Sequence, residues 1–326
     1  MKKLRKFASV MMLAAAVVFA VGCTKPDEPN NGGNNNGGGN NGGGETPEVP
    51  TAPTGAIDGK FSINATGGKV YFAKGNLQYQ ASTNTFRFAE HQWNYVGGST
   101  LENQLGNVEG SDNCLVSSTY EGWIDLFCYG TSGWNGGAEY CQPYDYSGSA
   151  NDFLPYNLTG EYANADWGVY NPISNGGNQA GMWRTLTNDE WEYIINGRSS
   201  EIRYAKAQVN DVNGLILVPD GWNNSVYELK NVNSTGSNWD VNTISLSLWE
   251  NTLEPAGCVF LPNAGHRNIG SIILVTETEG YGNYWTSTVK EDNLSVYIVG
   301  IYWQGPHLGT AWANGGYSVR LVRDVQ

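Results

Sequence analysis

The C-terminal segment 284–323 constrains the fold most strongly, because it joins a strand pattern to a dense run of aromatic residues. It begins with Tyr284-Trp285 and ends with Gly316-Tyr317-Ser318-Val319-Arg320 and a few further residues. At the two-residue period of a β-strand, one face carries Tyr297, Val299 and Ile301, and the other carries Val296, Ile298, Gly300 and Tyr302. Both faces are apolar, so alternation alone leaves open which one points into the core.

A glycine-rich stretch follows this strand, and we interpret it as a loop that carries large side chains. Its members are Trp303, Gln304, His307, Leu308, Thr310, Trp312 and Asn314. Exposed Trp, Tyr, Leu and His on a short rigid support are typical of a recognition surface. The alternative is that Trp303 and Trp312 close the edge of a β core, and residue types do not decide between the two.

The overall composition predicts short strands and long loops rather than helices. The 326 residues include 43 Gly, 12 Trp and 19 Tyr, and only 15% are charged. The formal net charge is −13, and removal of Lys2, Lys3, Arg5 and Lys6 with an N-terminal signal takes it to −17. An acidic surface of this kind disfavours nucleic acid and anionic lipid headgroups as partners.

The N-terminus predicts export and lipid anchoring. Residues 1–22 combine a basic start with an apolar run from Phe7 to Val21, which is typical of a signal peptide and too short and Ala-rich for a confident membrane span. Ala20-Val21-Gly22-Cys23 resembles a bacterial lipobox, which predicts a diacylglycerol anchor on Cys23. The alternative is an uncleaved anchor with an incidental cysteine. The following Lys25-Pro26-Asp27-Glu28 is similar to acidic signals that send lipoproteins of the Bacteroides group to the cell surface, so we expect outer-membrane, surface-exposed anchoring.

A linker and one folded domain are expected after the anchor. Residues 23–58 contain the nearly pure Asn/Gly tract 30–44 and several prolines, a composition that cannot bury a core and predicts disorder. Residues 59–326, about 270 in number, show no second linker and no repeat, so they predict a single domain.

Local patterns place several elements in this domain. Alternation predicts strands at 61–63, 69–73, 76–79, 85–88, 215–218, 259–262 and 271–275. Thr187 and Glu190 have capping-box spacing, Trp191 follows on a helical face, and Gly197 marks the stop. Residues 97–182 are rich in Gly, Asn and Tyr and predict a long irregular layer.

Four segments then carry a specific resemblance. Residues 183–193, WRTLTNDEWEY, resemble the helix start of the formylglycine-generating-enzyme branch of the C-type-lectin-like fold. Residues 258–267 resemble its central strand and turn, and 284–288 and 316–323 resemble its final strands, in the same order. The resemblance spans about residues 183 to 323 and implies an α+β, β-rich C-type-lectin-like fold with long irregular loops and few short helices.

The same ending is similar to the variable proteins of diversity-generating retroelements and to surface lipoproteins of the Bacteroides group. In those variable proteins the C-terminal segment forms the ligand-contacting surface, and the retroelement rewrites adenine-containing codons. The resemblance implies a protein or glycan ligand on another cell, a phage or a host surface, with the lipid anchor as the sole membrane contact. The implied contact positions are Ile298, Gly300, Tyr302, Trp303, Gln304, His307, Leu308, Thr310, Trp312 and Asn314.

Catalysis is not expected. Enzymes of the resembled branch bind copper through paired C-terminal cysteines, but Leu321 stands where the last of these would be and no cysteine follows Cys258. No nucleophile elbow, phosphate loop or zinc-protease motif occurs. We therefore expect no catalytic residue, metal or cofactor. Two alternatives remain, namely a structural fimbrial or cell-envelope component and a secreted glycan-active enzyme. Such an enzyme would need a pair of catalytic carboxylates. The candidates show no spacing that singles out a pair; they are Asp220, Glu250, Glu254, Glu277, Glu279, Glu291 and Asp292.

Histidines and cysteines fit structural roles better than catalytic ones. His91, His266 and His307 are widely spaced, and we interpret His266 as a structural turn residue and His307 as a contact residue. Cys114, Cys128 and Cys141 lack the paired spacing of a zinc site. In an exported protein these three and Cys258 are expected to oxidise, with three pairings open and buried free thiols as the alternative.

Two short motifs are similar to calcium-ligand motifs of sugar-binding lectins, namely Glu254-Pro255 and Trp222-Asn223-Asn224. Their spacing and order are wrong for a shared site, so we interpret both as turns. A sugar ring could still stack on Trp303 or Trp312, because an indole offers a large apolar face.

Overall fold

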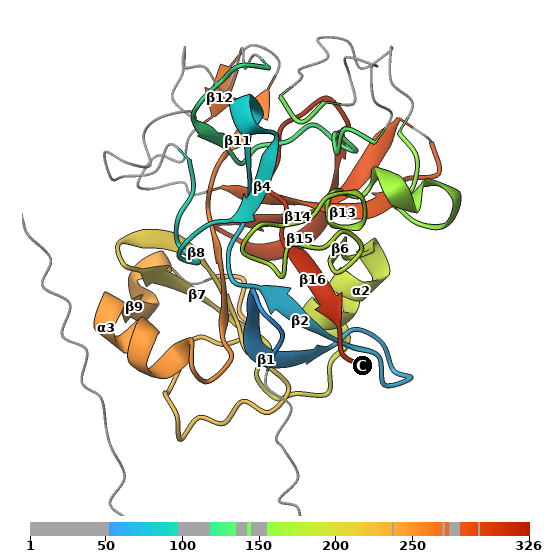
Figure 1. The fold of residues 1–326 in the computed structure, drawn as a ribbon. Helices are drawn as coiled ribbons and strands as arrows, with labels where there is room; N and C mark the ends of the chain where they lie inside the picture. The colour runs from blue at the N-terminus through green and yellow to red at the C-terminus, as the bar shows by residue number, and fades with distance from the viewer. Residues whose placement is uncertain are drawn as a thin grey trace, which may run out of the picture. The chain divides into compact units, whose positions relative to one another are not determined.

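Small sheets, rather than one continuous sheet, organise the chain (Figure 1). The computed structural model describes residues 52–96, 118–134, 142–144, 155–236, 238–268, 271–273, 281–292 and 294–326. The predicted signal peptide, Cys23 and the Asn/Gly tract lie outside these residues. In the described part, no helix is long and apolar enough to cross a membrane.

The strands pair antiparallel except β7 with β9. The first sheet contains, in spatial order, β1 (Ala56–Ser62), β2 (Lys69–Ala73), β16 (Leu321–Asp324) and β6 (Arg184–Thr185), and the second contains β10 (Val259–Pro262), β8 (Val212–Leu217), β7 (Tyr204–Val209) and β9 (Thr243–Ile244). The third sheet contains β13 (Gly282–Val289), β14 (Ser295–Tyr302) and β15 (Gly305–Trp312). The two remaining sheets are β4 (Thr85–Phe88), β3 (Leu77–Gln80) and β5 (Trp123–Ile124), and the pair β11 (His266–Asn268) and β12 (Ser271–Ile273).

The helices are short. They are α1 (Trp167–Tyr170), α2 (Asn188–Glu192) and α3 (Leu246–Leu248), with 3₁₀ segments at Ala81–Thr83, Gly160–Ala165 and Trp239–Asn242 and π turns at Tyr193–Gly197 and Trp249–Leu253. The fold is therefore α+β and β-rich. The long stretch 97–182 contains, in its described part, only β5, α1 and one 3₁₀ segment besides irregular backbone.

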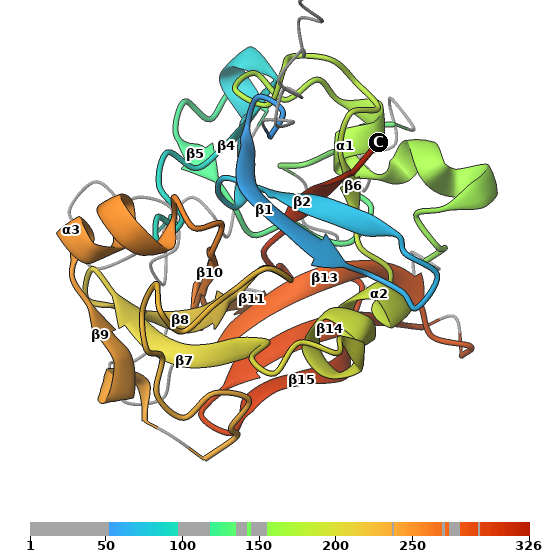
Figure 2. The same cartoon turned by 90° about the horizontal axis from the view of Figure 1, so that it is seen from below.

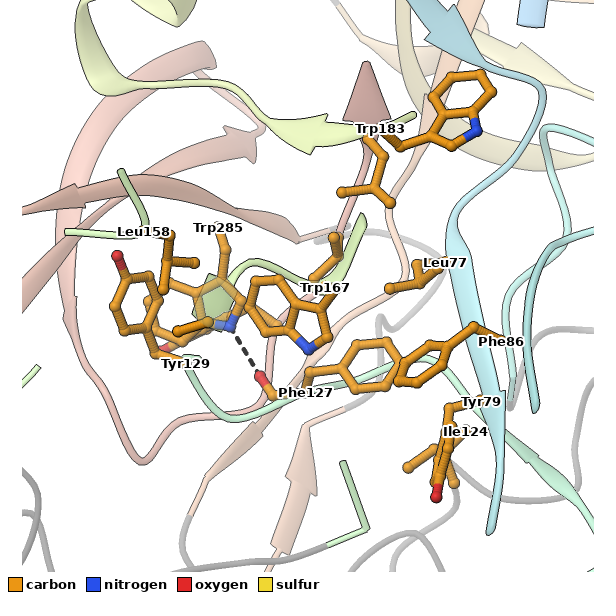
Figure 3. Packing of buried hydrophobic residues seen from close by; sticks show 14 of the residues in the cluster. Leu77, Tyr79, Phe86, Ile124, Phe127, Tyr129, Leu158, Trp167, Trp183 and Trp285 are labelled. Carbon is orange, nitrogen blue, oxygen red and sulfur yellow. Dashed lines mark hydrogen bonds between the residues drawn. The ribbon is translucent and has the colours of Figure 1, made fainter. Parts of the chain in front are cut away.

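The sheet of β13, β14 and β15 has a hydrophobic core on each face. One face of the sheet, here called the helix-side face, packs against α2. The core on this face includes Phe61, Phe72, Trp191, Ile194, Tyr284, Val299 and Ile301. On the loop-side face the sheet packs in a second core that includes Phe127, Tyr129, Trp167, Trp285, Val296 and Ile298 (Figure 3). Both strand faces therefore point into a core, which explains why the alternation of β14 did not identify an outer face.

A third core lies around β7, β8 and β10. Ile216 and Phe260 alternate with residues of the helix-side core along their strands, and they pack with Trp249. The rings of Trp249 and Phe260 are 5.8 Å apart in an edge arrangement.

Helix α2 begins as the sequence predicts. The hydroxyl of Thr187 accepts from the backbone N–H of Glu190 at 3.2 Å, and the Glu190 carboxylate accepts from the N–H of Thr187 at 2.8 Å. This reciprocal capping box is confirmed. The helix continues as a π turn to Gly197 before the chain becomes extended at Arg198.

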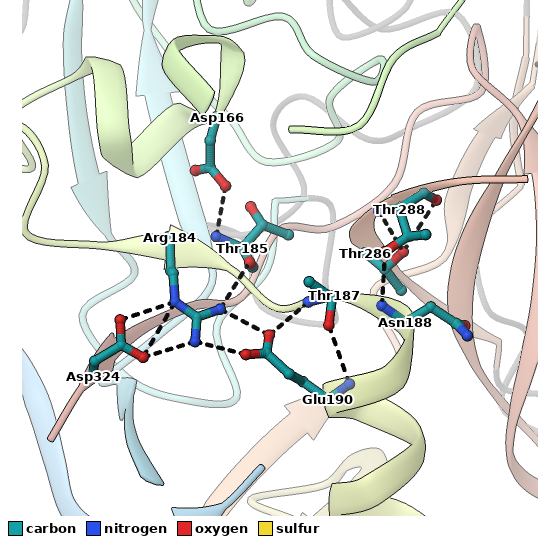
Figure 4. A network of polar contacts seen from close by, with 9 residues as sticks. All are labelled: Asp166, Arg184, Thr185, Thr187, Asn188, Glu190, Thr286, Thr288 and Asp324. Atoms are coloured by element: carbon teal, nitrogen blue, oxygen red, sulfur yellow. Dashed lines mark hydrogen bonds and ion pairs between the residues drawn. The ribbon is translucent and has the colours of Figure 1, made fainter. Parts of the chain in front are cut away.

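An ion-pair network fastens the C-terminal strand to this helix (Figure 4). Arg184 on β6 donates to both carboxylate oxygens of Glu190 at 2.8 Å and to Asp324 on β16 at 2.7 Å. Because Arg184 pairs in a fork with two carboxylates, the network fixes geometry more strongly than a single surface pair would.

A buried arginine links separate parts of the chain. Arg320 is 1% exposed and donates to Asn76 at 3.2 Å, to Gln92 at 2.7 Å and to the carbonyl of Phe260 at 3.0 Å. Gln92 in turn donates to Glu254 at 2.9 Å. Burial lowers the pKa of Arg320 to about 10.

Most of the predicted strands fall close to their ranges, but β1 begins at Ala56, within the segment predicted as a linker, and the two-residue strands β5, β6 and β9 were not predicted. Two longer strands also correct the sequence analysis. Residues 305–312, predicted as a loop, form strand β15, because a two-residue turn at Trp303-Gln304 returns the chain beside β14. Strand β7 was not predicted at all. Its residues Tyr204–Val209 are mostly buried on both faces and so lack the polar alternation of a half-exposed strand.

The cysteines in the described part are thiols. Cys128 and Cys258 are both free and buried, so the expected disulfides do not include them, and the alternative of buried free thiols holds for this pair. Cys258 lies in the third core, where burial raises the pKa of its thiol. Cys114 and Cys141 lie outside the described residues.

Asp166 makes stability depend on pH. It is 1% exposed and accepts from the backbone N–H of Gly168 at 2.9 Å and of Thr185 at 2.7 Å, which caps α1 and joins it to β6. Burial raises its pKa to about 6, although these hydrogen bonds oppose the rise. The folded state therefore binds this proton more tightly than the unfolded state, whose carboxyl has a pKa of about 3.9.

We expect Asp166 to cost stability as pH rises from about 4 to about 6. A shift of about two pKa units corresponds to a loss on the order of 3 kcal/mol over that window. Urea unfolding of the wild type and of Asp166→Asn at pH 4 to 7 measures this loss. The free energy of unfolding of the wild type, relative to that of the variant, should be highest at pH 4 and should fall as the pH rises. A difference between the two that stays constant, or grows with pH, would contradict the assignment.

Candidate functional site

The two tryptophans of the C-terminal hairpin are exposed. Trp303 and Trp312 each have 57% of their surface accessible, more than any other large apolar side chain in the described part. This excludes the interpretation that they close the edge of a core. They extend from a hairpin in which β14 is packed on both faces and β15 is half-exposed, so large apolar surface is displayed beside a well-packed strand.

The two indoles lie at opposite ends of the β14–β15 hairpin. Trp303 is in the turn beside the pair Tyr302–Gly305, whereas Trp312 pairs with Ser295 at the other end. Seven residue steps separate these ends, or about 23 Å at roughly 3.3 Å per residue. We call the surface of Tyr302, Trp303, Gln304 and His307 the turn end, and that of Tyr297, Thr310 and Trp312 the open end.

Stacked rings build the turn end. The rings of Tyr302 and His307 lie 4.4 Å apart, and Tyr281 meets Tyr302 edge-on at 5.2 Å. The Tyr302 hydroxyl donates to Asn283 Oδ1 at 2.9 Å, which fixes the ring. Partial desolvation of its ring by these neighbours lowers the pKa of His307, so its neutral form is favoured near pH 7.

Gly300 is required by this stack rather than by ligand contact. A Cβ at position 300 would overlap the ring of Tyr302 and lie 2.7 Å from His307 Cε1. The absence of a side chain on β14 therefore lets the two rings meet over the strand.

A buried lysine anchors the turn that carries Trp303. Lys206 on β7 is 1% exposed and donates from Nζ to the backbone carbonyl of Trp303. Its ammonium also lies 4.4 Å from the centre of the Trp239 ring. Gly305, at a φ of +93°, completes the turn close to Thr235. Burial lowers the pKa of Lys206.

The open end is simpler. Thr310 and Trp312 are exposed, and Tyr297 pairs with Thr310 across the strands on the same face. Leu308, two residues earlier, is half-buried against the helix-side core. This end is therefore an apolar strip that runs out from the core.

The structure divides the ten predicted contact positions. Exposed are Trp303, Gln304, His307, Thr310 and Trp312, while Tyr302 and Leu308 are half-buried. Buried are Ile298, Gly300 and Asn314. Ile298 packs with Trp285 in the loop-side core, and the backbone carbonyl of Asn314 accepts from Cys128 at 3.5 Å, so neither side chain lies on the surface that was predicted for it.

Several site residues were missed by the sequence analysis. Tyr281 and Asn283 shape the turn end from β13 and the residue before it, and Lys206 holds the turn from a strand about a hundred positions earlier. Tyr297 could have been found, because the two-residue period places it on the helix-side face with Val299.

Among the residues considered for catalysis, His266, Asp220 and Glu254 make structural contacts, whereas Glu250 and Glu291 are exposed. His266, interpreted from the sequence as a turn residue, lies instead in strand β11, and its ring stacks on Tyr317 at 5.8 Å between ring centres. Asp220 accepts from Ser62 at 2.7 Å and pairs with Lys69 at 3.0 Å, and Glu254 accepts from Gln92. Glu277 and Glu279 lie outside the described residues.

One polar pocket lies away from the hairpin. It has a volume of about 290 Å³ and is lined by Ser200, Glu201, Ile202, Asp220, Trp222, Asn223 and Asn224. The Trp222-Asn223-Asn224 motif in it is a turn, as predicted, with Asn223 Oδ1 accepting from the N–H of Ser225 at 2.8 Å. No group of three or more His, Cys, Asp or Glu side chains suited to a metal ion occurs among the described residues.

Comparisons of the chain with protein-family models, with curated proteins and with solved structures gave no significant match.

We expect Lys206 to control the order of the turn end. Lys206→Met keeps the length of the side chain but removes the charged donor, and such a bond is worth roughly 1.5–3 kcal/mol. Amide exchange of residues 302–305 should accelerate about tenfold or more, measured by hydrogen–deuterium exchange. Lys230→Met, a change of an exposed lysine, is the control, and equal exchange in both variants would show that Lys206 does not hold the turn.

Proposed function

We propose that this protein is a lipid-anchored cell-surface protein that binds a macromolecular ligand through the β14–β15 hairpin. The observation that carries the proposal is the exposure of Trp303 and Trp312, 57% each, on a hairpin whose strand β14 is packed on both faces. Rigid aromatic anchors are the side chains that contribute most to binding energy at interfaces. Their separation of about 23 Å favours a macromolecule, since a single small ligand does not span that length.

The proposed architecture is a C-type-lectin-like domain carried on a flexible Asn/Gly linker. Support comes from the order of the resembling segments and from the confirmed capping box at Thr187, which lies within the first of them. In this proposal the N-terminal lipobox places the domain at the outer membrane, and the linker gives it reach from the surface.

The ligand-contacting residues of the proposal are the exposed members of the hairpin. Trp303, His307 and Gln304 contact the ligand at the turn end, and Thr310 and Trp312 contact it at the open end. Tyr302 and Leu308 position them. Uncharged aromatic and amide side chains suit protein surfaces and sugar rings alike.

The double variant Trp303→Ala/Trp312→Ala should lose binding and keep its fold. Each hot-spot residue is worth about 2 kcal/mol or more, so loss of both should lower affinity on the order of 1,000-fold, measured on arrays of glycans and of purified cell-surface proteins. Trp191→Ala should do the reverse: it empties a buried site at a cost of about 3–5 kcal/mol of stability and leaves the surface unchanged. Retained binding in the double variant would refute the hairpin as the binding surface.

We further propose that a retroelement diversifies this hairpin. Deep sequencing of the codons for residues 284–326 in a population of the source bacterium tests it. Variation should concentrate at adenine-derived codons of the exposed positions, whereas the codons of buried Tyr284, Trp285 and Val299 should stay constant. A uniform segment would leave a binding protein of fixed specificity.

A further inference from the structure

Strand β15 is the free edge of its sheet. The order of strands is β13, β14, β15, and Figure 2 shows β15 at the outer side of the sheet beside β14. Its eight residues pair in continuous register with β14, from Gly305 opposite Tyr302 to Trp312 opposite Ser295. No bulge interrupts this pairing, so the outer edge is straight.

The direction of the backbone groups follows from one side-chain contact. Thr286 on β13 donates to the carbonyl of Tyr297 at 2.9 Å, so the odd-numbered residues of β14 direct their backbone groups toward β13. The even-numbered residues of β14 therefore face β15. Because backbone direction alternates along a strand, positions 306, 308, 310 and 312 of β15 direct their N–H and C=O groups outward.

These outward groups are largely unused. The carbonyl of Trp312 accepts from the N–H of Gly315 at 3.0 Å. Among the described residues, nothing hydrogen-bonds the N–H groups of Leu308, Thr310 and Trp312 or the carbonyls of Pro306, Leu308 and Thr310. Three donors and three acceptors in a row match what an added strand of five or six residues needs.

The edge also lacks the usual protection against added strands. Natural edge strands carry charged side chains, bulges or prolines that prevent pairing with other chains. Strand β15, GPHLGTAW, has no charged residue, and its single proline lies at the turn end. The stretch from His307 to Trp312 is left open.

The side chains that flank this edge define the chemistry of a partner. On the helix-side face an added strand would lie beside Leu308, Thr310 and Trp312, which favours apolar or β-branched residues at alternate positions. The chain has a net charge of −13, and α2, on the same face, exposes Asp189 and Glu192. A segment with basic residues therefore fits better than an acidic one.

We propose that the outer edge of β15 binds an extended, basic segment of a partner protein as an added β-strand. The proposal depends on the proposed function and narrows the macromolecular ligand to a protein. Trp312 provides the apolar contact beside the added strand, and the backbone of residues 308–312 provides the hydrogen bonds.

Two other occupants fit less well. A second copy could pair symmetrically about Thr310, with Leu308 opposite Trp312, but two chains of charge −13 repel each other. The linker of this chain is a poor candidate, because its Asn, Gly and Pro residues are poor strand formers. A basic segment from another protein meets neither obstacle.

A peptide selection with matched edge variants tests the proposal. Twelve-residue peptides from a random display library are selected on the full-length protein in detergent, and their affinities are compared for wild type, Thr310→Pro and Thr310→Val. Thr310→Pro removes an outward N–H and leaves the β14 pairing intact, so binding should fall at least tenfold. Thr310→Val keeps the N–H and the β-branched shape, so its affinity should exceed that of Thr310→Pro by at least about threefold.

Methylation of the peptide backbone gives a second measurement that does not depend on the folding of Thr310→Pro. In a bound peptide, N-methylation at every second residue should abolish binding, and N-methylation at the intervening residues should not, because an added strand uses alternate amides. Equal effects at both sets of positions would overturn strand addition, as would selected peptides that bind Thr310→Pro as well as the wild type or a selection that yields none.

Sedimentation distinguishes the remaining occupant. A dimer of the wild type that Thr310→Pro dissociates would assign the edge to a second copy and overturn the proposal. If Trp303→Ala/Trp312→Ala loses ligand binding on the arrays while Thr310→Pro retains it, strand addition fails and the proposed function stands.

Discussion

The arrangement of the domain depends on the hydrogen bonds of one buried group, the guanidinium of Arg320. A buried charge is costly unless hydrogen bonds replace its water, and Arg320 obtains them from Asn76, Gln92 and the Phe260 carbonyl. These three partners come from segments far apart in the sequence. These hydrogen bonds of Arg320 therefore form only when the N-terminal part of the domain, the central β10 strand and the C-terminal segment have all assembled.

This convergence explains why the hairpin can display aromatic side chains without losing order. Ser318, two residues before Arg320, forms a β-bridge with Tyr284 on β13. This bridge connects the sheet of β13, β14 and β15 to the hydrogen bonds around Arg320. With cores on both faces, the sheet has little freedom to bend. What remains exposed is its two ends and its outer edge, and all three candidate contact surfaces lie there.

The sequence predicted those features that depend on near neighbours. The capping box at Thr187 and the strands β2, β3 and β4 follow from local spacing. Strand β15 could not be found in this way, because its glycines resemble a loop and Trp303-Gln304 lacks the Asn-Gly chemistry of a hairpin turn. The Arg320 contacts were also beyond reach, since Asn76 and Gln92 lie 244 and 228 positions away. The site was predicted in part: its exposed tryptophans were identified, but Ile298 and Asn314 were placed on a surface from which packing removes them.

The distance between the two ends of the hairpin has a consequence for how such a surface changes over generations. Sites more than about 10 Å apart that share no partners usually contribute additively to free energy. A substitution near Trp312 therefore leaves the ring stack around Tyr302 undisturbed. A favourable residue at one end makes the same contribution to the binding free energy regardless of which residues occupy the other end. A lineage can improve the two ends one at a time, and the number of variants it must sample is the sum of the alternatives at each end rather than their product.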